Sequence, residues 1–395
     1  MKFVVALVVV FTLANVVWTQ PSALEQLSQA QNEFGLALFQ ELIKGQTLKN
    51  IFISPTSVAL ALAMTYNGAA GETKEVMAKV LKISKISDQE FNKANFLLQS
   101  SLTSQNKKLT VKIANSLWID KSCKFTRAFV ATNKKFYRAQ LASLNFASPK
   151  AIFAINQWVK NATAGRIEKI AEELPEDVWA ILINALYFKG AWQEAFEGTK
   201  TRPFYLLDGA EKSQTFLYKK GKFLYFENDE LQAISIPYAD GSYTMDIFLP
   251  RKELPIDKLI YSLTPERYLE WLKSLETREG EVYLPQFKLE YESSLKEALS
   301  RLGMEIAFDQ DRADFTRMAI TPIKGRIFIG DIKHKTFIEV TREGTEAAAV
   351  TGVFMEIKGV PAKPFTLVLD RPFLYMIRNN KTQSIVFIGL LTEPK

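Results

Sequence analysis

The sequence predicts an α+β fold in a single large domain. Strand-like segments such as residues 50–53 and 335–340 occur together with helix-like ones such as residues 55–64. The chain has 395 residues, of which 47% are hydrophobic and 24% charged, so it can bury a large core. This length would allow two or three domains, but no Pro-, Gly- or Ser-rich linker, repeat or low-complexity tract divides it. We therefore expect one domain over residues 20–395.

Residues 1–19 are expected to form a secretory signal peptide. Lys2 precedes the apolar run 4–17, which is too short to span a membrane. The small residues Val17 and Thr19 place the cleavage site near Gln20. No second long apolar run follows, so we expect a soluble, secreted, extracellular protein without membrane attachment. The single Cys123 cannot form an internal disulfide, so stability must come from the core.

The segment around Ser54 predicts a strand that leads into a buried helix. Residues 50–53 favour a strand, Ser54 can cap the following helix, and Pro55 suits its first turn. Residues 58–64 are apolar on all sides, so this helix should lie in the core.

A run of small residues near the C-terminus is the most informative segment. A segment that is exposed in one state and a central strand in another needs short side chains and no proline. Proline would remove a ladder hydrogen bond, and an inward-pointing charge would block insertion. We call this run the hinge: Glu343, Gly344, Thr345, Glu346, Ala347, Ala348, Ala349, Val350 and Thr351.

Side-chain alternation extends the strand pattern beyond the hinge. One face would carry only small or apolar side chains: Thr345, Ala347, Ala349, Thr351, Val353 and Met355. The other face would carry both carboxylates: Glu346, Ala348, Val350, Gly352, Phe354 and Glu356. On these residues alone, a short alanine-rich helix or an ordinary surface loop is an equal alternative.

Further motifs make the chain resemble the serpins from about residue 28 to its end. Residues 181–192 are similar to the central strand of that family and its turn. The other matching segments are 50–57, 67–73, 156–167, 284–287, 299–315, 370–374 and 387–389. The resemblance implies three β-sheets surrounded by eight to nine helices, with a large central sheet that accepts a reactive-centre loop at about residues 343–364.

In that family a target protease binds and cleaves the loop as it would a substrate. The cleaved loop then inserts into the central sheet as a new strand. The family's spacing from Gly344 places the scissile bond between Lys358 and Gly359. A lysine there implies a trypsin-like serine protease as the covalent partner. Cleavage at Met355 or Phe354 would leave a shorter segment to insert. The alternative for Lys358 is a solvated loop lysine.

His334 is the only histidine of the chain. A lone histidine beside apolar residues is most often a hydrogen-bonded core residue. The resemblance implies in addition a place in the shutter, the polar cluster beneath the point where the sheet parts: Ser54, Ser57, Asn184 and His334. Because the one histidine lies in a core strand, we expect no Ser-His-Asp or Cys-His site and no enzyme activity.

The family pattern is broken at the breach, the top of the central sheet, which comprises Trp192, Gln286 and Arg342. Serpins usually carry a glutamate where this chain has Arg342, and a lysine where it has Gln286. Replacing both members of an ion pair is milder than leaving one charge alone. We expect Arg342 to contact Gln286, Glu343 or another nearby acid.

The formal net charge of +7 is small for this length, so we expect no nucleic-acid partner. The sequence shows no His and Cys cluster for a metal and no nucleotide-binding loop, and no cofactor is required. Some serpins bind heparin-like chains along a basic helix, but the matching helix here, about residues 88–104, carries only Lys93. The candidates for glycosaminoglycan binding, with a solvated turn as the alternative, are Lys212, Lys219, Lys220 and Lys222.

Two sequons make the chain a candidate glycoprotein, at Asn161 and Asn380. Thr163 already matches a family position, so the first sequon can be a coincidence. Asn380 lies in an expected hairpin turn and is therefore the better acceptor.

Taken together, these features predict a secreted, monomeric inhibitory serpin that traps a trypsin-like protease as an acyl-enzyme. The alternative is a non-inhibitory serpin that acts as a ligand carrier or binding protein. Such members tend to carry bulky, charged or proline residues in the hinge. A secreted hydrolase is disfavoured because no catalytic base is available.

Overall fold

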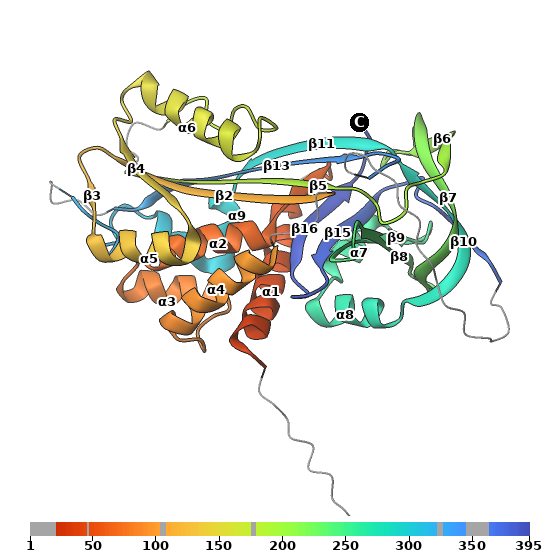
Figure 1. Ribbon diagram of the computed structural model, residues 1–395, viewed down its shortest axis with the longest axis horizontal. Helices are drawn as coiled ribbons and strands as arrows, with labels where there is room; N and C mark the ends of the chain where they lie inside the picture. The colour runs from red at the N-terminus through yellow and green to blue at the C-terminus, as the bar shows by residue number, and fades with distance from the viewer. Residues whose placement is uncertain (1–20, 46, 103–107, 175–178, 322–326, 345–362) are drawn as a thin grey trace, which may run out of the picture.

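The computed structural model describes residues 21–45, 47–102, 108–174, 179–321, 327–344 and 363–395 (Figure 1). In these ranges the chain forms nine α-helices and three β-sheets, of nine, five and two strands. The predicted α+β fold is therefore confirmed. The signal peptide, residues 345–351 of the hinge, Lys358 and Gly359 all lie outside the described residues.

The five-stranded sheet contains the two strands between which the loop is expected to insert. β5 and β13 are parallel neighbours at its centre, and each has an antiparallel partner on its other side. Every residue of β5 is buried apart from Lys189, which explains why this strand is an almost continuous apolar run. In sheet order the strands are β11 (Phe287–Ser294), β13 (Ile329–Val340), β5 (Ala180–Gly190), β2 (Leu109–Asp120) and β4 (Gln140–Leu144).

Helices cover both faces of this sheet (Figure 1). α6 (Pro149–Ala162) crosses one face and packs Ile155 and Val159 onto it. α2 (Pro55–Tyr66) lies on the other face and is buried over its whole length. Ser54 caps α2, because its Oγ accepts from the Ser57 N–H at 3.2 Å, and Pro55 occupies the first turn as predicted. The other helices on this side are α1 (Ala23–Ile43), α3 (Gly71–Val80), α4 (Asp88–Leu102), α5 (Arg127–Tyr137) and α9 (Lys296–Leu299).

The nine-stranded sheet forms the other half of the molecule, flanked by α7 (Ile256–Tyr261) and α8 (Pro265–Lys273) (Figure 1). Its strands, in order, are β1 (Ile51–Ile53), β16 (Ile385–Leu391), β15 (Phe373–Asn379), β9 (Tyr243–Pro250), β8 (Leu231–Tyr238), β7 (Glu211–Glu227), β10 (Glu276–Pro285) and β14 (Phe365–Val368), with β6 (Gly198–Tyr205) paired to β7. The two-stranded sheet pairs β3 (Lys124–Phe125) with β12 (Ala319–Ile320).

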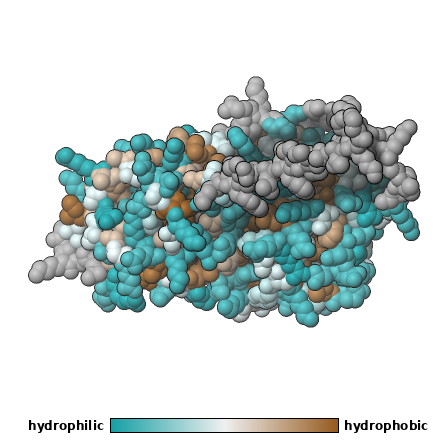
Figure 2. Space-filling view, turned by 90° about the horizontal axis from the view of Figure 1, so that it is seen from below, coloured by the Kyte–Doolittle hydropathy of each residue, from teal (hydrophilic) through white to brown (hydrophobic). Residues whose placement is uncertain are grey.

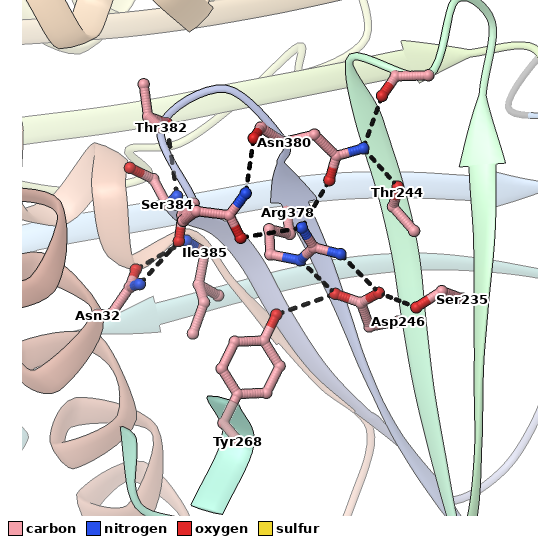
Figure 3. Close-up of polar contacts among 12 residues, drawn as sticks. Asn32, Ser235, Thr244, Asp246, Tyr268, Arg378, Asn380, Thr382, Ser384 and Ile385 are labelled. Carbon is pink, nitrogen blue, oxygen red and sulfur yellow. Dashed lines mark hydrogen bonds and ion pairs between the residues drawn. The ribbon is translucent and has the colours of Figure 1, made fainter. Parts of the chain in front are cut away.

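A buried ion pair joins two strands of the nine-stranded sheet (Figure 3). Arg378 in β15 donates through Nε to the Asp246 carboxylate in β9 at 2.8 Å. The Tyr268 hydroxyl donates to the same carboxylate at 2.9 Å, and the Ser235 hydroxyl donates at 2.5 Å. Because the carboxylate has a donor on each oxygen, this cluster is a satisfied structural element.

The surface seen in Figure 2 is mostly hydrophilic, with apolar residues in small, scattered patches. Within the described ranges, no helix is both long and apolar enough to cross a bilayer. The same ranges contain no group of three or more His, Cys, Asp and Glu side chains that could hold a metal ion.

Candidate functional site

A buried polar cluster joins three strands of the five-stranded sheet to the start of α2. The strand registers place Asn115 of β2 opposite Asn184 of β5, and Asn184 opposite His334 of β13. The three side chains therefore share one row across the sheet. Ser54 and Ser57, at the N-terminus of α2, contact this row, and all five residues are buried.

Each ring nitrogen of His334 has one hydrogen-bond partner. The Ser54 N–H donates to Nε2 at 3.1 Å, and Nδ1 lies 2.6 Å from Asn184 Oδ1. Because Nε2 accepts, Nδ1 carries the proton and donates to Asn184. Asn184 Nδ2 in turn donates to Ser57 Oγ and to Asn115 Oδ1, each at 2.5 Å. The structure thus brings the four predicted shutter residues together in one network.

The sequence analysis missed Asn115. A single amide in residues 109–120 gives no signal by itself, since half of the residues in a strand of a soluble protein can be polar. Only the strand register, which places Asn115 beside Asn184, identifies it as a member of the network.

Complete burial lowers the pKa of His334 to about 3 from its ordinary value of 6.5. Between these values the unfolded chain binds a proton that the native chain does not. The stability that neutral His334 contributes is therefore full above pH 6.5, and falls by up to about 1.4 kcal/mol per unit as the pH decreases toward 3.

This pH dependence can be isolated because the chain has no other histidine. Between pH 7 and pH 5, where carboxylates titrate little, the denaturant midpoint of the wild type should fall. In a His334→Gln variant this decrease should be largely absent. Equal slopes in the two proteins would show that His334 does not titrate as described.

The ladder between β5 and β13 stops before either strand ends. The last pair is Tyr187 with Phe337, whereas the strands continue to Gly190 and Val340. Over this stretch β5 remains paired to β2, and β13 remains paired to β11. The two central strands therefore part at the end of the sheet where β13 leads into the hinge.

Trp192 holds the residues that connect β13 to the hinge. Its backbone N–H donates to the Glu343 carbonyl at 3.0 Å, and its Nε1 donates to the Thr341 carbonyl at 3.0 Å. The indole is buried and stacks on Tyr238, with 4.4 Å between ring centroids. Trp192 of the predicted breach therefore lies at the root of the hinge.

Gly344 closes a tight turn against the end of β5. The Thr341 N–H donates to the Gly344 carbonyl at 2.9 Å, and Gly344 forms an antiparallel bridge with Ala191. Its φ is +127°, and a Cβ here would lie 2.4 Å from both the Ala191 Cα and the Trp192 nitrogen. Only glycine fits this position, because the clash involves backbone atoms of the two residues that directly follow β5.

A family model described as "Serpin (serine protease inhibitor)" matches residues 29–394. The chain belongs to the serpin family. The leukocyte elastase inhibitor of Sus scrofa is 37% identical over 389 residues, which cover 94% of this chain and all of that protein.

Two solved structures show the same fold. The native state of tengpin, a thermophilic serpin, has a TM-score of 0.84 at 31% identity and covers 93% of this chain and 94% of its own. Native protease nexin-1 with heparin has a TM-score of 0.83 at 28% identity, with 94% and 99% covered. As a serpin, the chain is a protease inhibitor, and the serpin fold predicted from its motifs is confirmed.

In this serpin, Arg342 contacts its neighbour in sequence. Its Nε lies 3.8 Å from Glu343 Oε1, and the two side chains are 53% and 41% exposed, so the pair contributes little to stability. The expected pairing with Glu343 is thus present. The described contacts include none between Arg342 and Gln286, whose carbonyl instead accepts from Gln214 Nε2 at 2.5 Å.

The four candidate glycosaminoglycan-binding lysines lie along β7, so the interpretation as a solvated turn is wrong. Lys212 Nζ lies 2.8 Å from Glu393, and Lys219 Nζ lies 2.7 Å from Glu194. The other two, Lys220 and Lys222, stand opposite carboxylates of β10. Those carboxylates are Glu281 and Glu279. Each lysine therefore has an acidic neighbour, and the four do not form a purely cationic patch.

The asparagines of the two sequons differ in the hydrogen bonds and exposure of their side chains. Asn380 Nδ2 donates to the Gly241 carbonyl at 2.6 Å and to Thr244 Oγ1 at 2.8 Å, while its Oδ1 accepts from Arg378 (Figure 3). A glycan on this nitrogen would break those bonds. Asn161 is exposed at the end of α6, although Thr163 of the same sequon is buried and its hydroxyl donates to the Val159 carbonyl at 2.8 Å.

Proposed function

We propose that this serpin is a secreted suicide-substrate inhibitor of trypsin-like serine proteases, with the scissile bond between Lys358 and Gly359. The observation that carries the proposal is the parting of β5 and β13 beside Gly344. This is the point at which a strand that continues from the hinge would begin to insert. The small side chains and the absence of proline in residues 345–351 support the same conclusion.

The arrangement of β5 and β13 indicates how the protease would be trapped. The protease serine attacks the Lys358 carbonyl and forms an acyl-enzyme, and the cleaved loop then inserts between β5 and β13. Insertion must break the hydrogen bond between Asn184 and His334, because this bond crosses the gap between the two strands. Before insertion each side chain of the network has at least one hydrogen-bond partner, so the network holds the strands together and releases them as a unit, which helps to trap the native state kinetically.

The remaining parts of the proposal concern setting and partners. The apolar run at residues 4–17 supports secretion, and an oxidising compartment is compatible with a chain that holds one buried, unpaired Cys123. We propose a monomer that needs no cofactor and binds neither nucleic acid nor membrane. Asn161 is the proposed glycosylation site.

Heparin was present in the solved structure of protease nexin-1. A heparin-like chain that bound β7 of this serpin would have to displace Glu393 from Lys212 and Glu194 from Lys219. These ion pairs would weaken binding of a heparin-like chain at β7, and we propose that inhibition proceeds without one.

Mixing the purified protein with trypsin tests the proposal. A covalent band at the summed mass on a denaturing gel is expected. A Lys358→Leu variant should lose association rate with trypsin by about 100-fold or more, because its side chain cannot pair with the pocket carboxylate. The same variant should still form a covalent band with chymotrypsin, which shows that its fold and hinge are intact.

Two outcomes would contradict the proposal. Cleavage after Lys358 without a covalent band would favour the non-inhibitory alternative, a carrier or binding protein. A Lys358→Leu variant that inhibits trypsin as fast as the wild type would place the scissile bond elsewhere.

A further inference from the structure

The short strand β14 fixes the chain that follows the reactive-centre loop to the nine-stranded sheet. It has four residues and, within the described ranges, its strand partner is β10 alone, to which it runs parallel. Figure 1 labels β10 at the end of the molecule opposite β4, which lies where β5 begins. The C-terminal end of the loop is therefore attached far from the start of β5.

Phe365, the first residue of β14, packs between two aromatic rings of β7. Its ring stacks on Tyr225, with 3.7 Å between centroids and 4° between planes, and meets the Phe223 ring edge-on at 6.1 Å. Gly280 of β10 lies opposite Phe365, and a Cβ at this glycine would come within 2.4 Å of the ring. The missing side chain of Gly280 thus leaves room for the Phe365 ring, which is buried.

Arg278 of β10 joins this aromatic group to the end of the loop. Its guanidinium carbon lies 5.0 Å from the centroid of the Tyr225 ring and 6.0 Å from that of Phe365. Nη2 donates to the Lys363 carbonyl at 3.2 Å, and Nη1 donates to the Glu227 carboxylate at 3.2 Å. One planar side chain therefore contacts both the backbone before β14 and its first ring. We call this group the anchor: Phe223, Tyr225, Arg278, Gly280 and Phe365.

An uncleaved loop that stays attached at both ends is too short to insert completely between β5 and β13. β5 has 11 residues and is therefore about 35 Å long. If 11 of the 18 residues 345–362 lined β5, the remaining seven would span at most about 28 Å, counted to the Cα of Lys363. They would have to return along the whole of β5, because β14 lies at the opposite end of the molecule. Complete insertion therefore requires either cleavage of the loop or release of β14.

We propose that the anchor makes insertion conditional on cleavage, and that Arg278 is the positioning residue that holds Lys363 and Phe365 in place. While the anchor is intact, the uncleaved loop stays outside the sheet and the inhibitor stays active. When the anchor opens, β14 leaves β10 and the intact loop inserts without a protease, which inactivates the inhibitor. This role rests on the proposed function, because it presupposes insertion between β5 and β13.

A Gly280→Ala variant tests the anchor without removing any of its side chains, since the added Cβ would displace the Phe365 ring. Stored without protease, it should lose its inhibition of trypsin at least about tenfold faster than the wild type. Gly221→Ala is the matched control. Gly221 lies opposite Gly280 on β7, and the nearest atom to its added Cβ is 4.0 Å away, so this variant should stay active as long as the wild type.

An Arg278→Met variant keeps a long apolar side chain but removes both hydrogen bonds, and it should lose activity about tenfold faster than the wild type. Arg278→Lys should fall between the two, because an ammonium cannot stack and donate in two directions within one plane. Arg251→Met is the matched control. Arg251 donates to the other oxygen of Glu227 at 3.0 Å and to the Asn228 carbonyl at 2.8 Å, so it pairs with the same carboxylate without contacting β14.

The inactive product shows whether the loop has inserted or the protein has merely unfolded. An inserted product should have the mass of the uncleaved chain, resist trypsin at Lys358 and unfold at a higher temperature than the starting protein, because the five-stranded sheet has gained a strand. A destabilised variant would instead unfold at a lower temperature, with Lys358 still cleaved.

That second result would overturn the proposal, as would anchor variants that stay active as long as the wild type. Equally fast loss of activity in the two controls would also overturn it. If the wild type forms no covalent complex with trypsin, the proposed inhibition is refuted. The mass and unfolding temperature of the stored variants then still test whether the anchor holds the loop outside the sheet.

Discussion

A Gly344→Ala variant is expected to lose the turn between Thr341 and Gly344, and its free energy of unfolding should fall by about 2–4 kcal/mol. The added Cβ would lie 2.4 Å from the backbone of Ala191 and Trp192, and a φ of +127° is unfavourable for alanine. Side-chain movement cannot relieve this contact, because both opposing atoms belong to the backbone. The turn to Thr341 and the bridge to Ala191 should therefore break.

The substitution should also reduce the fraction of serpin that traps the protease covalently. Without the bridge, the loop no longer starts beside the gap between β5 and β13, so it inserts more slowly. Hydrolysis of the acyl-enzyme then competes better with insertion. The variant should be cleaved by trypsin mainly as a substrate, with most of the covalent band lost. The thermal unfolding midpoint and the ratio of complex to cleaved serpin measure the two effects.

Gly209→Ala is the matched control. Gly209 also has a positive φ, of +83°, but nothing lies within 4 Å of an added Cβ. This variant should keep its inhibitory ratio and lose less stability than Gly344→Ala. If both variants behave alike, backbone conformation rather than contact with β5 explains the effect, and the role assigned to Gly344 is wrong.

An Asn184→Ala variant is expected to lose about 3–6 kcal/mol of stability. The substitution leaves three buried groups without their partner: His334 Nδ1–H, Asn115 Oδ1 and Ser57 Oγ. Each group that stays buried and unsatisfied costs about 1–3 kcal/mol. The sheet should also open more readily, because the side-chain bond across the β5–β13 gap is gone.

A double-mutant cycle with His334→Leu tests whether these residues act as one network. Removing both side chains leaves fewer orphaned groups than the sum of the single changes, so the losses should be less than additive. Denaturant unfolding at pH 7 measures all four proteins. Additive losses would mean that Asn184 and His334 contribute separately. Asn161→Ala, at an exposed amide, should change the midpoint little.

Features that depend on neighbours in sequence were predicted well. Ser54 and Pro55 start α2 as expected, and the all-round apolar pattern of residues 58–64 corresponds to complete burial. These properties follow from local hydrogen bonding and from hydrophobic periodicity, which a sequence displays directly.

Features that depend on strand neighbours were predicted less well. The sequence predicts one basic cluster between Lys212 and Lys222, because its lysines lie close together along the chain. In the structure each lies near a carboxylate from a distant segment, such as Glu393 or Glu194. The sequence likewise predicts an accessible turn residue at Asn380. In the structure its side chain donates hydrogen bonds to the Gly241 carbonyl and to the Thr244 hydroxyl.

The sequence by itself determined the family, the buried start of α2, the composition of the hinge and the four expected shutter residues. Only the tertiary structure decided that Asn115 completes the shutter, that β5 and β13 part beside Gly344, and that Gly344 fits against Ala191 without room for a Cβ. The reason is that local conformation depends on adjacent residues, whereas register, close backbone approach and charge pairing depend on segments that meet only when the chain folds.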